Sequence, residues 1–195
     1  MKLILASKSP RRREILQNLG LSFEIVTAET DESSTTSDPC ALVEELSERK
    51  GIAVRDLLLS EGRDLSDTVI ISSDTVVAAD GKILGKPRDP EDAANMLRML
   101  SGREHEVISG ISLIGGGRCG VAHEVTRVAF ATLNEENISF YLRSGEPFDK
   151  AGAYAIQGLA SMWIEGIRGD YFNVVGLPVH RMCKLYSELF GNEIL

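Results

Sequence analysis

Hydrophobic positions follow a strand or a helix period along most of the chain, and the two kinds of segment alternate. Apolar runs and two-residue alternation predict strands over residues 2–6, 22–28, 68–79, 82–84, 105–114, 121–132 and about 161–167. Three-to-four spacing predicts helices over residues 10–19, 39–59, 90–100, 135–143 and 177–190. Turn signals at Asp80-Gly81 and in the segment 115–120 join neighbouring strands as hairpins, which argues against a purely parallel sheet. The pattern predicts an α/β fold, a mixed twisted sheet flanked by helices, in one domain over residues 1–195.

Two helices carry details that the structure can test. Ser9 and Pro10 are typical of a helix start, with serine as the cap and proline in the first turn. In the long helix 39–59 the expected buried stripe is Leu42, Leu46, Ala53 and Leu57, and Gly51 is expected to interrupt the helix.

Charge and composition narrow the classes of function. The chain has 195 residues and a net charge of −8, from 29 acidic and 21 basic side chains. This balance argues against broad nucleic-acid binding, yet it allows a small basic pocket for a small anion. No apolar run approaches the ~20 residues of a membrane helix, and the N-terminus lacks the order of a signal peptide, so we expect a cytoplasmic protein without a membrane partner. The spacing of Cys40, Cys119 and Cys183 suggests neither a disulfide framework nor a zinc site.

A basic cluster lies where the first strand meets the first helix. Ser7-Lys8-Ser9-Pro10-Arg11-Arg12-Arg13 places three arginines in a first helical turn, the wrong sign for the helix dipole. Backbone N–H groups at a helix start bind anions, and arginine matches phosphate with two parallel hydrogen bonds. The cluster therefore predicts a phosphate site, and the alternative is a solvated basic helix start.

Acidic residues mark two further candidates. Asp74 lies inside the apolar run 68–79, where a buried unpaired carboxylate would be costly, so it is expected at a cleft as a metal ligand or general base. Glu29-Thr30-Asp31-Glu32 follows a strand and could supply oxygen ligands to Mg²⁺. The alternatives are an aspartate facing solvent on an edge strand and an ordinary solvated acidic loop.

Three glycine-containing segments remain. GKILGKP, residues 81–87, fails as a Walker loop because its glycines are too close and Pro87 replaces the hydroxyl residue, although Lys86 could still reach a phosphate. GGGRCG, residues 115–120, is followed by a strand and is interpreted as a hairpin loop. In GEPFDKAGAYAIQG, residues 145–158, Gln157 could read a base edge with its paired donor and acceptor, and the alternative is a glycine-rich core crossing.

Several of these motifs together resemble one family. LASKSPRRREIL, SSDTVV, GKILGKPRDPEDAANML, SGREHEV, GEPFDKAGAYAIQG and GDYFNVVGLP look like the Maf proteins, in order and over nearly the whole chain. The resemblance implies a fold similar to inosine triphosphatase, with a cleft between two lobes. It also implies a nucleoside triphosphate pyrophosphatase that uses a divalent metal, Mg²⁺ or Mn²⁺. The AYAIQG form resembles the branch that prefers dTTP and UTP.

The resemblance assigns roles to residues that match the motifs. Asp74 matches the proton acceptor, and Glu32 with Asp74 would hold the metal. The substrate would meet Ser7, Arg11, Arg12, Lys50, Thr75, Lys86 and Gln157, of which Arg11, Thr75 and Gln157 match positions linked to substrate choice.

Other readings stay open at this point. The family is also called septum formation inhibitor, so one alternative is a non-hydrolytic nucleotide-binding regulator of cell division. A second is a house-cleaning hydrolase of modified purine triphosphates. A homodimer is what the resemblance suggests for the oligomeric state.

Overall fold

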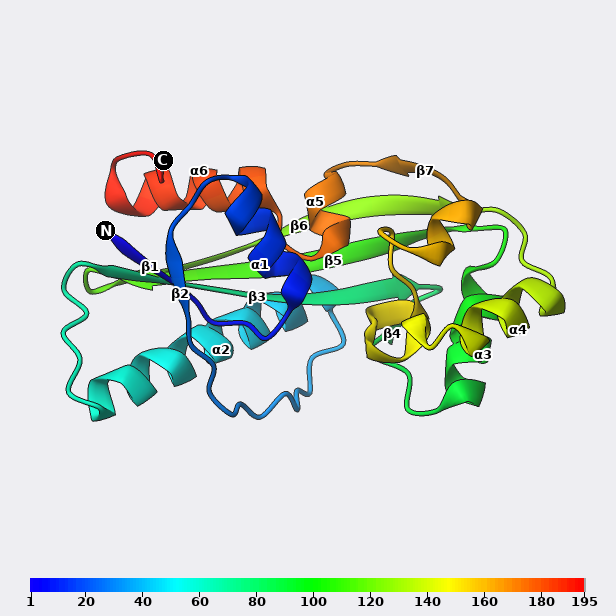
Figure 1. Ribbon diagram of the computed structural model, residues 1–195, viewed down its shortest axis with the longest axis horizontal. Coiled ribbons are helices and arrows are strands. Elements are labelled where there is room, and N and C mark those ends of the chain that lie inside the picture. The colour runs from blue at the N-terminus through cyan, green and yellow to red at the C-terminus, as the bar shows by residue number, and fades with distance from the viewer. Residues whose placement is uncertain (195) are drawn as a thin grey trace. The chain divides into compact units, whose positions relative to one another are not determined.

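The protein is described by a computed structural model that covers residues 1–194, and it forms one mixed sheet flanked by helices (Figure 1). The strands are β1 (Lys2–Leu5), β2 (Phe23–Ile25), β3 (Thr68–Ala79), β4 (Lys82–Leu84), β5 (Glu104–Gly115), β6 (Arg118–Phe130) and β7 (Ile164–Arg168). The helices are α1 (Pro10–Asn18), α2 (Pro39–Ser60), α3 (Pro90–Leu100), α4 (Glu135–Arg143), α5 (Tyr171–Val175) and α6 (Val179–Phe190). Three short 3₁₀ helices complete the chain, η1 (Glu146–Asp149), η2 (Ala151–Ala153) and η3 (Leu159–Trp163). Within these residues no helix is long and apolar enough to cross a membrane.

The sheet confirms the predicted fold class. Its strand order is β2-β1-β3-β5-β6-β7, with β4 paired to β3 outside this path. Strand β1 runs parallel to β2 and β3, whereas β4 is antiparallel to β3 and β7 is antiparallel to β6. Asp74 lies on a central strand and not on an edge strand, because β3 has neighbours on both sides.

The contacts divide the chain into two compact units. The first comprises Met1–Asp74, Ser109–Glu124 and the described residues from Gly176 onward, and the second comprises Thr75–Ile108 and Val125–Val175. The predicted single domain of two lobes around a central cleft stays a prediction.

In the first unit, α2 packs on the sheet more closely than its sequence suggests. Gly51 does not interrupt the helix; a Cβ there would lie 2.8 Å from the Ser72 hydroxyl oxygen and 2.9 Å from the Ile114 Cδ1. Glycine at this point is therefore what lets the helix approach the strands. The Ser72 hydroxyl donates to the Ser47 carbonyl at 2.6 Å, so a hydrogen bond also joins α2 to β3.

The predicted stripe of α2 is wrong by about one position. Of Leu42, Leu46, Ala53 and Leu57, only Leu46 is buried. The buried positions are Val43, Leu46, Ser47, Gly51, Val54 and Leu58. The close approach at Gly51 sets which face turns inward, because the small residues Ser47 and Gly51 take places that hydrophobicity would give to larger side chains.

Four other segments differ from expectation. Strand β2 covers Phe23–Ile25 and is shorter than the predicted 22–28. The predicted strand near 161–167 begins at Ile164, because the preceding residues form the 3₁₀ helix η3. The terminal helix begins at Val179, and α5 was not predicted because five residues carry too little periodicity to detect.

A buried histidine belongs to the aromatic core of the second unit. His105 is 3% exposed, its Nε2 lies 2.7 Å from the Tyr154 hydroxyl, and its Nδ1 has no hydrogen-bond partner among the described residues. The rings of His105, Phe130 and Tyr154 contact one another edge to face, at centroid distances of 4.7–5.3 Å. Burial lowers the pKa of His105 from 6.5 to about 4, since the charged ring would lose its hydration.

This histidine makes stability depend on pH in a defined window. Between pH 6.5 and 4 the unfolded chain protonates His105 and the folded chain does not, so stability falls as the pH falls. The full shift corresponds to about 3 kcal/mol of unfolding free energy, present above pH 6.5 and lost by pH 4. Urea unfolding of the protein and of His105→Gln across this range measures the effect. Carboxylate titration is common to both proteins, so a difference between them that does not shrink toward acid would refute the assignment.

Candidate functional site

The turn between β1 and α1 is organised by two serines. The Ser9 hydroxyl accepts a hydrogen bond from the Arg12 backbone N–H at 3.5 Å and caps the helix, with Pro10 as its first residue. The Ser7 hydroxyl accepts from the Ser9 N–H at 3.2 Å. The predicted helix start is confirmed, and it presents Arg11 and Arg12 from the first turn of α1.

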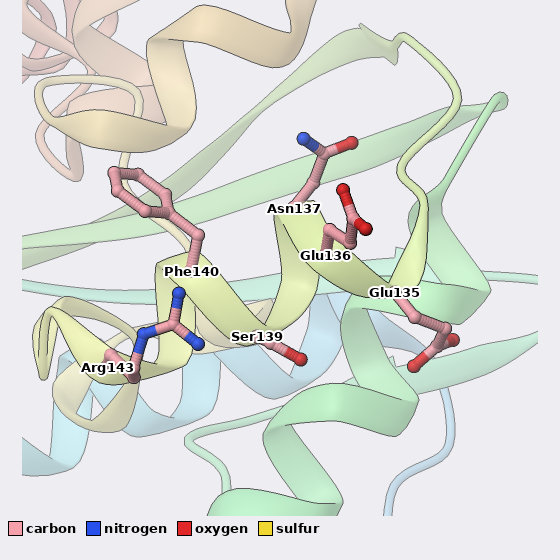
Figure 2. A pocket seen from close by; sticks show the side chains of 6 residues that line it. All are labelled: Glu135, Glu136, Asn137, Ser139, Phe140 and Arg143. Atoms are coloured by element: carbon pink, nitrogen blue, oxygen red, sulfur yellow. The ribbon is translucent and has the colours of Figure 1, made fainter.

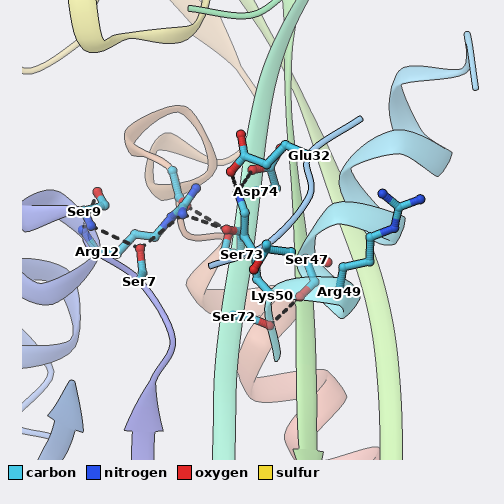
Figure 3. Close-up of polar contacts among 12 residues, drawn as sticks. Ser7, Ser9, Arg12, Glu32, Ser47, Arg49, Lys50, Ser72, Ser73 and Asp74 are labelled. Atoms are coloured by element: carbon cyan, nitrogen blue, oxygen red, sulfur yellow. Dashed lines mark hydrogen bonds and ion pairs between the residues drawn. The ribbon is translucent and has the colours of Figure 1, made fainter. Parts of the chain in front are cut away.

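Arg12 ties this turn to the middle of β3 and to the chain before α6 (Figure 3). Its Nε donates to the Gly176 carbonyl at 2.7 Å, and its Nη1 donates to the Ser73 carbonyl at 2.7 Å and to the Ser7 hydroxyl at 3.3 Å. The Ser73 hydroxyl also donates to the Gly176 carbonyl, at 3.1 Å. Burial lowers the pKa of Arg12, and the negative charge of Asp74 opposes that change. Arg12 therefore supports the strand immediately before Asp74 as well as carrying charge into the site.

Two carboxylates converge on one ammonium group. Lys50 Nζ lies 2.5 Å from an Asp74 carboxylate oxygen and 2.8 Å from a Glu32 oxygen. The Lys50 and Asp74 side chains are 20% and 14% exposed, whereas Glu32 is 62% exposed. Helix α2, the central strand β3 and an acidic loop thus bring these three groups to one point. Their charges are screened less than on an open surface because two of the three are mostly buried.

The donor set fits a divalent cation that prefers oxygen. Carboxylate oxygens suit Mg²⁺ and Mn²⁺, and the two oxygens must lie close together because both touch the same nitrogen. Among residues 1–194 no three or more His, Cys, Asp or Glu side chains gather as a metal site. Glu32 and Asp74 would therefore supply only part of a coordination shell. Mg²⁺ commonly takes the remainder from water and substrate phosphate.

Three residues assigned to the substrate belong to the second unit. Thr75 follows Asp74 along β3, Lys86 is exposed just after β4, and Gln157 is exposed in a bend before η3. Ser7, Arg11, Arg12, Glu32, Lys50 and Asp74 all belong to the first unit. It stays a prediction that Thr75, Lys86 and Gln157 lie close to the site residues of the first unit.

Comparison with known proteins places the chain in a family. The family model described as Maf-like protein matches residues 2–189. The chain belongs to the Maf family. Curated relatives named dTTP/UTP pyrophosphatase occur in Symbiobacterium thermophilum, with 46% identity over 99% of this chain and 96% of that protein, and in Pelotomaculum thermopropionicum, with 45% identity over 100% and 99%. A third, from Clostridioides difficile, is 45% identical over 98% and 96%.

The solved structures give a more distant match. The Staphylococcus aureus Ham1 protein aligns with a TM-score of 0.45 and 14% identity, over 67% of this chain and 72% of that one. A likeness at this level supports no argument about site or activity, so the sequence relatives carry the assignment to the Maf family.

Arg49 also belongs to the candidate site, and it was not predicted from the sequence. Arg49 Nη1 donates to the carbonyls of Asp31 at 3.2 Å and Ser33 at 2.6 Å, and so holds the backbone on both sides of Glu32. Its Nη2 is bonded to Glu45, one turn earlier on α2. An i,i+4 Glu–Arg pair beside a site lysine was the available signal, but nothing in the pattern showed that its partner would be a distant backbone.

A separate hollow lies over α4, and none of its lining residues belongs to the candidate site. Figure 2 shows its lining side chains, which all come from this helix: Glu135, Glu136, Asn137, Ser139, Phe140 and Arg143. It mixes both signs of charge around a half-exposed phenylalanine. The hollow was not predicted, and nothing connects it with the candidate chemistry.

Proposed function

We propose that this Maf protein hydrolyses dTTP and UTP to the nucleoside monophosphate and pyrophosphate. The convergence of Glu32 and Asp74 on Lys50, beside the arginine-bearing start of α1, is the observation that carries the proposal. A triphosphate bears about four negative charges, which would explain why basic side chains gather at one place in a protein of net charge −8. The names of the 45–46% identical relatives support the same substrates.

The residues divide the reaction between proton transfer and charge neutralisation. Asp74 takes one proton from a water molecule whose oxygen bonds to the α-phosphorus, while the bond from that phosphorus to the bridging oxygen breaks and pyrophosphate leaves. Lys50 orients the Asp74 carboxylate through the 2.5 Å contact. Arg11, Arg12 and Lys86 neutralise phosphate oxygens, and Ser7 with the Arg11 N–H at the start of α1 positions them.

A divalent cation belongs to this proposal. Glu32 and Asp74 would hold Mg²⁺ or Mn²⁺, which would neutralise phosphate charge and polarise the reacting group when bound. Thr75 and Gln157 are proposed to contact the base, where the glutamine amide offers one donor and one acceptor. A homodimer and a cytoplasmic location remain predictions.

The test is release of pyrophosphate from a panel of triphosphates. Purified protein is assayed with dTTP, UTP, CTP, GTP and ITP, with Mg²⁺ or Mn²⁺ and with EDTA. We expect kcat/KM for dTTP and UTP to exceed the others at least tenfold, and EDTA to abolish turnover. Preference for ITP would instead identify the hydrolase of modified purines, and binding without turnover would identify the regulator of cell division.

A further inference from the structure

The segment that carries Gln157 has little regular structure of its own. Residues 154–158 lie between the 3₁₀ helices η2 and η3, and the Gln157 side chain is exposed. The preceding residue, Ala153, is fully buried with a positive φ of 61°, which costs a non-glycine residue about 1 kcal/mol. Contacts from outside the segment must therefore hold it in place.

Two side chains from α4 and η1 provide those contacts. The Tyr141 hydroxyl accepts a hydrogen bond from the Ala155 N–H at 3.3 Å and donates to a Glu146 oxygen at 2.8 Å. The other Glu146 oxygen accepts from the Leu159 N–H at 3.1 Å. The two anchored N–H groups lie two residues before and two residues after Gln157, so the pair fixes both ends of its bend.

The anchor is packed as well as hydrogen-bonded. Tyr141 is 1% exposed, and its ring meets Trp163 edge to face at 5.7 Å. A Cβ on Gly158 would lie 2.3 Å from a Glu146 carboxylate oxygen, so glycine beside Gln157 is what admits this carboxylate. Burial and the neighbouring Glu146 charge raise the pKa of Tyr141, which keeps its hydroxyl a donor.

We propose that Tyr141 and Glu146 are positioning residues for base selection, which hold the backbone on both sides of Gln157 so that its amide meets the pyrimidine edge. The inference rests on the proposed role of Gln157 in base recognition. An amide recognises a base only if its donor and acceptor are both in register, and a displacement of about 1 Å costs on the order of 100-fold in rate. In this role neither residue touches the substrate; each acts through the backbone of Ala155 and Leu159, on either side of Gln157.

The experiment compares five single variants in base selectivity. Glu146→Ala removes both carboxylate contacts and Tyr141→Phe removes the hydroxyl alone, while Gln157→Ala removes the amide. Ser101→Ala is the matched control, because its hydroxyl accepts from the Leu133 N–H at 2.7 Å in the same unit without touching residues 154–159. The readouts are kcat and KM for UTP and CTP, together with Tm.

We expect the UTP-to-CTP ratio of kcat/KM to fall at least tenfold in Gln157→Ala and at least fivefold in Glu146→Ala and Tyr141→Phe. For Glu146→Ala the loss with UTP should lie mainly in KM. Glu146→Gln, which keeps an acceptor for the Leu159 N–H, should recover most of the ratio. In Gln157→Ala, adding Glu146→Ala should lower the ratio no further, because there is no amide left to position.

The outcomes separate this inference from the proposed function. If Gln157→Ala lowers the ratio and Glu146→Ala only lowers Tm, as Ser101→Ala does, the positioning role is refuted and base reading by Gln157 stands. If Gln157→Ala leaves the ratio unchanged, base reading is refuted and the positioning role with it. Should Tyr141→Phe fail to fold, Glu146→Ala and Glu146→Gln decide the matter.

Discussion

Asp74→Asn is expected to lower kcat for UTP at least a thousandfold in a protein that still folds. Asparagine has the same shape as aspartate and can still accept the hydrogen bond from Lys50 Nζ, so the geometry at 2.5 Å needs little change. What is lost is the basic oxygen that takes the proton from water, and general-base catalysis contributes about 10²–10⁴-fold. Loss of one carboxylate from the proposed metal pair adds to the effect.

The measurement is single-turnover hydrolysis of UTP, with Tm and UTP binding as controls. A variant that binds UTP and melts within a few degrees of the parent, yet hardly turns over, supports the role of Asp74 as base. Full activity with an intact fold would remove Asp74 from the mechanism.

Arg12→Ala is expected to damage stability and catalysis together. The substitution removes the donors to the carbonyls of Gly176 and Ser73, and hydrogen bonds from charged groups contribute about 1.5–3 kcal/mol each. We expect a loss of about 2–4 kcal/mol in the free energy of unfolding, because water can replace part of what is lost. Since Ser73 directly precedes Asp74, we also expect kcat/KM for UTP to fall at least a hundredfold.

Arg13→Ala is the matched control, because Arg13 is exposed in the same turn of α1 and carries the same charge. It should change the unfolding free energy by less than about 0.5 kcal/mol. Urea unfolding and steady-state assays of both variants measure the two effects. Equal losses in Arg12→Ala and Arg13→Ala would show that total charge, and not the bonds of Arg12, matters at this helix start.

Local signals predicted the elements that carry the site. The Ser9-Pro10 start of α1, the long strand around Asp74 and the limits of α3 at Pro90 and Leu100 all agree with the structure. Each depends on residues close in the sequence: a cap, an apolar run, or a proline with a closing turn. Such signals act before any tertiary contact forms, which is why a single sequence contains them.

The meeting of the site residues could not be predicted in this way. The bond from Arg12 to Gly176 spans 164 positions, and Lys50 reaches Asp74 across 24. No local periodicity encodes these pairings, and Lys50 entered the site only through the family resemblance. The predicted inward face of α2 was wrong for a related reason. The close approach of the helix to the sheet at Gly51, and not hydrophobicity, orients that helix.

The central claim is attack of water at the α-phosphorus, with Asp74 as base. Hydrolysis of UTP in H₂¹⁸O, followed by ³¹P NMR or mass spectrometry of the products, tests it directly. The mechanism predicts one ¹⁸O atom in UMP and none in the pyrophosphate. Label in the pyrophosphate, or release of orthophosphate as the first product, would place the attack at another phosphorus and contradict the mechanism.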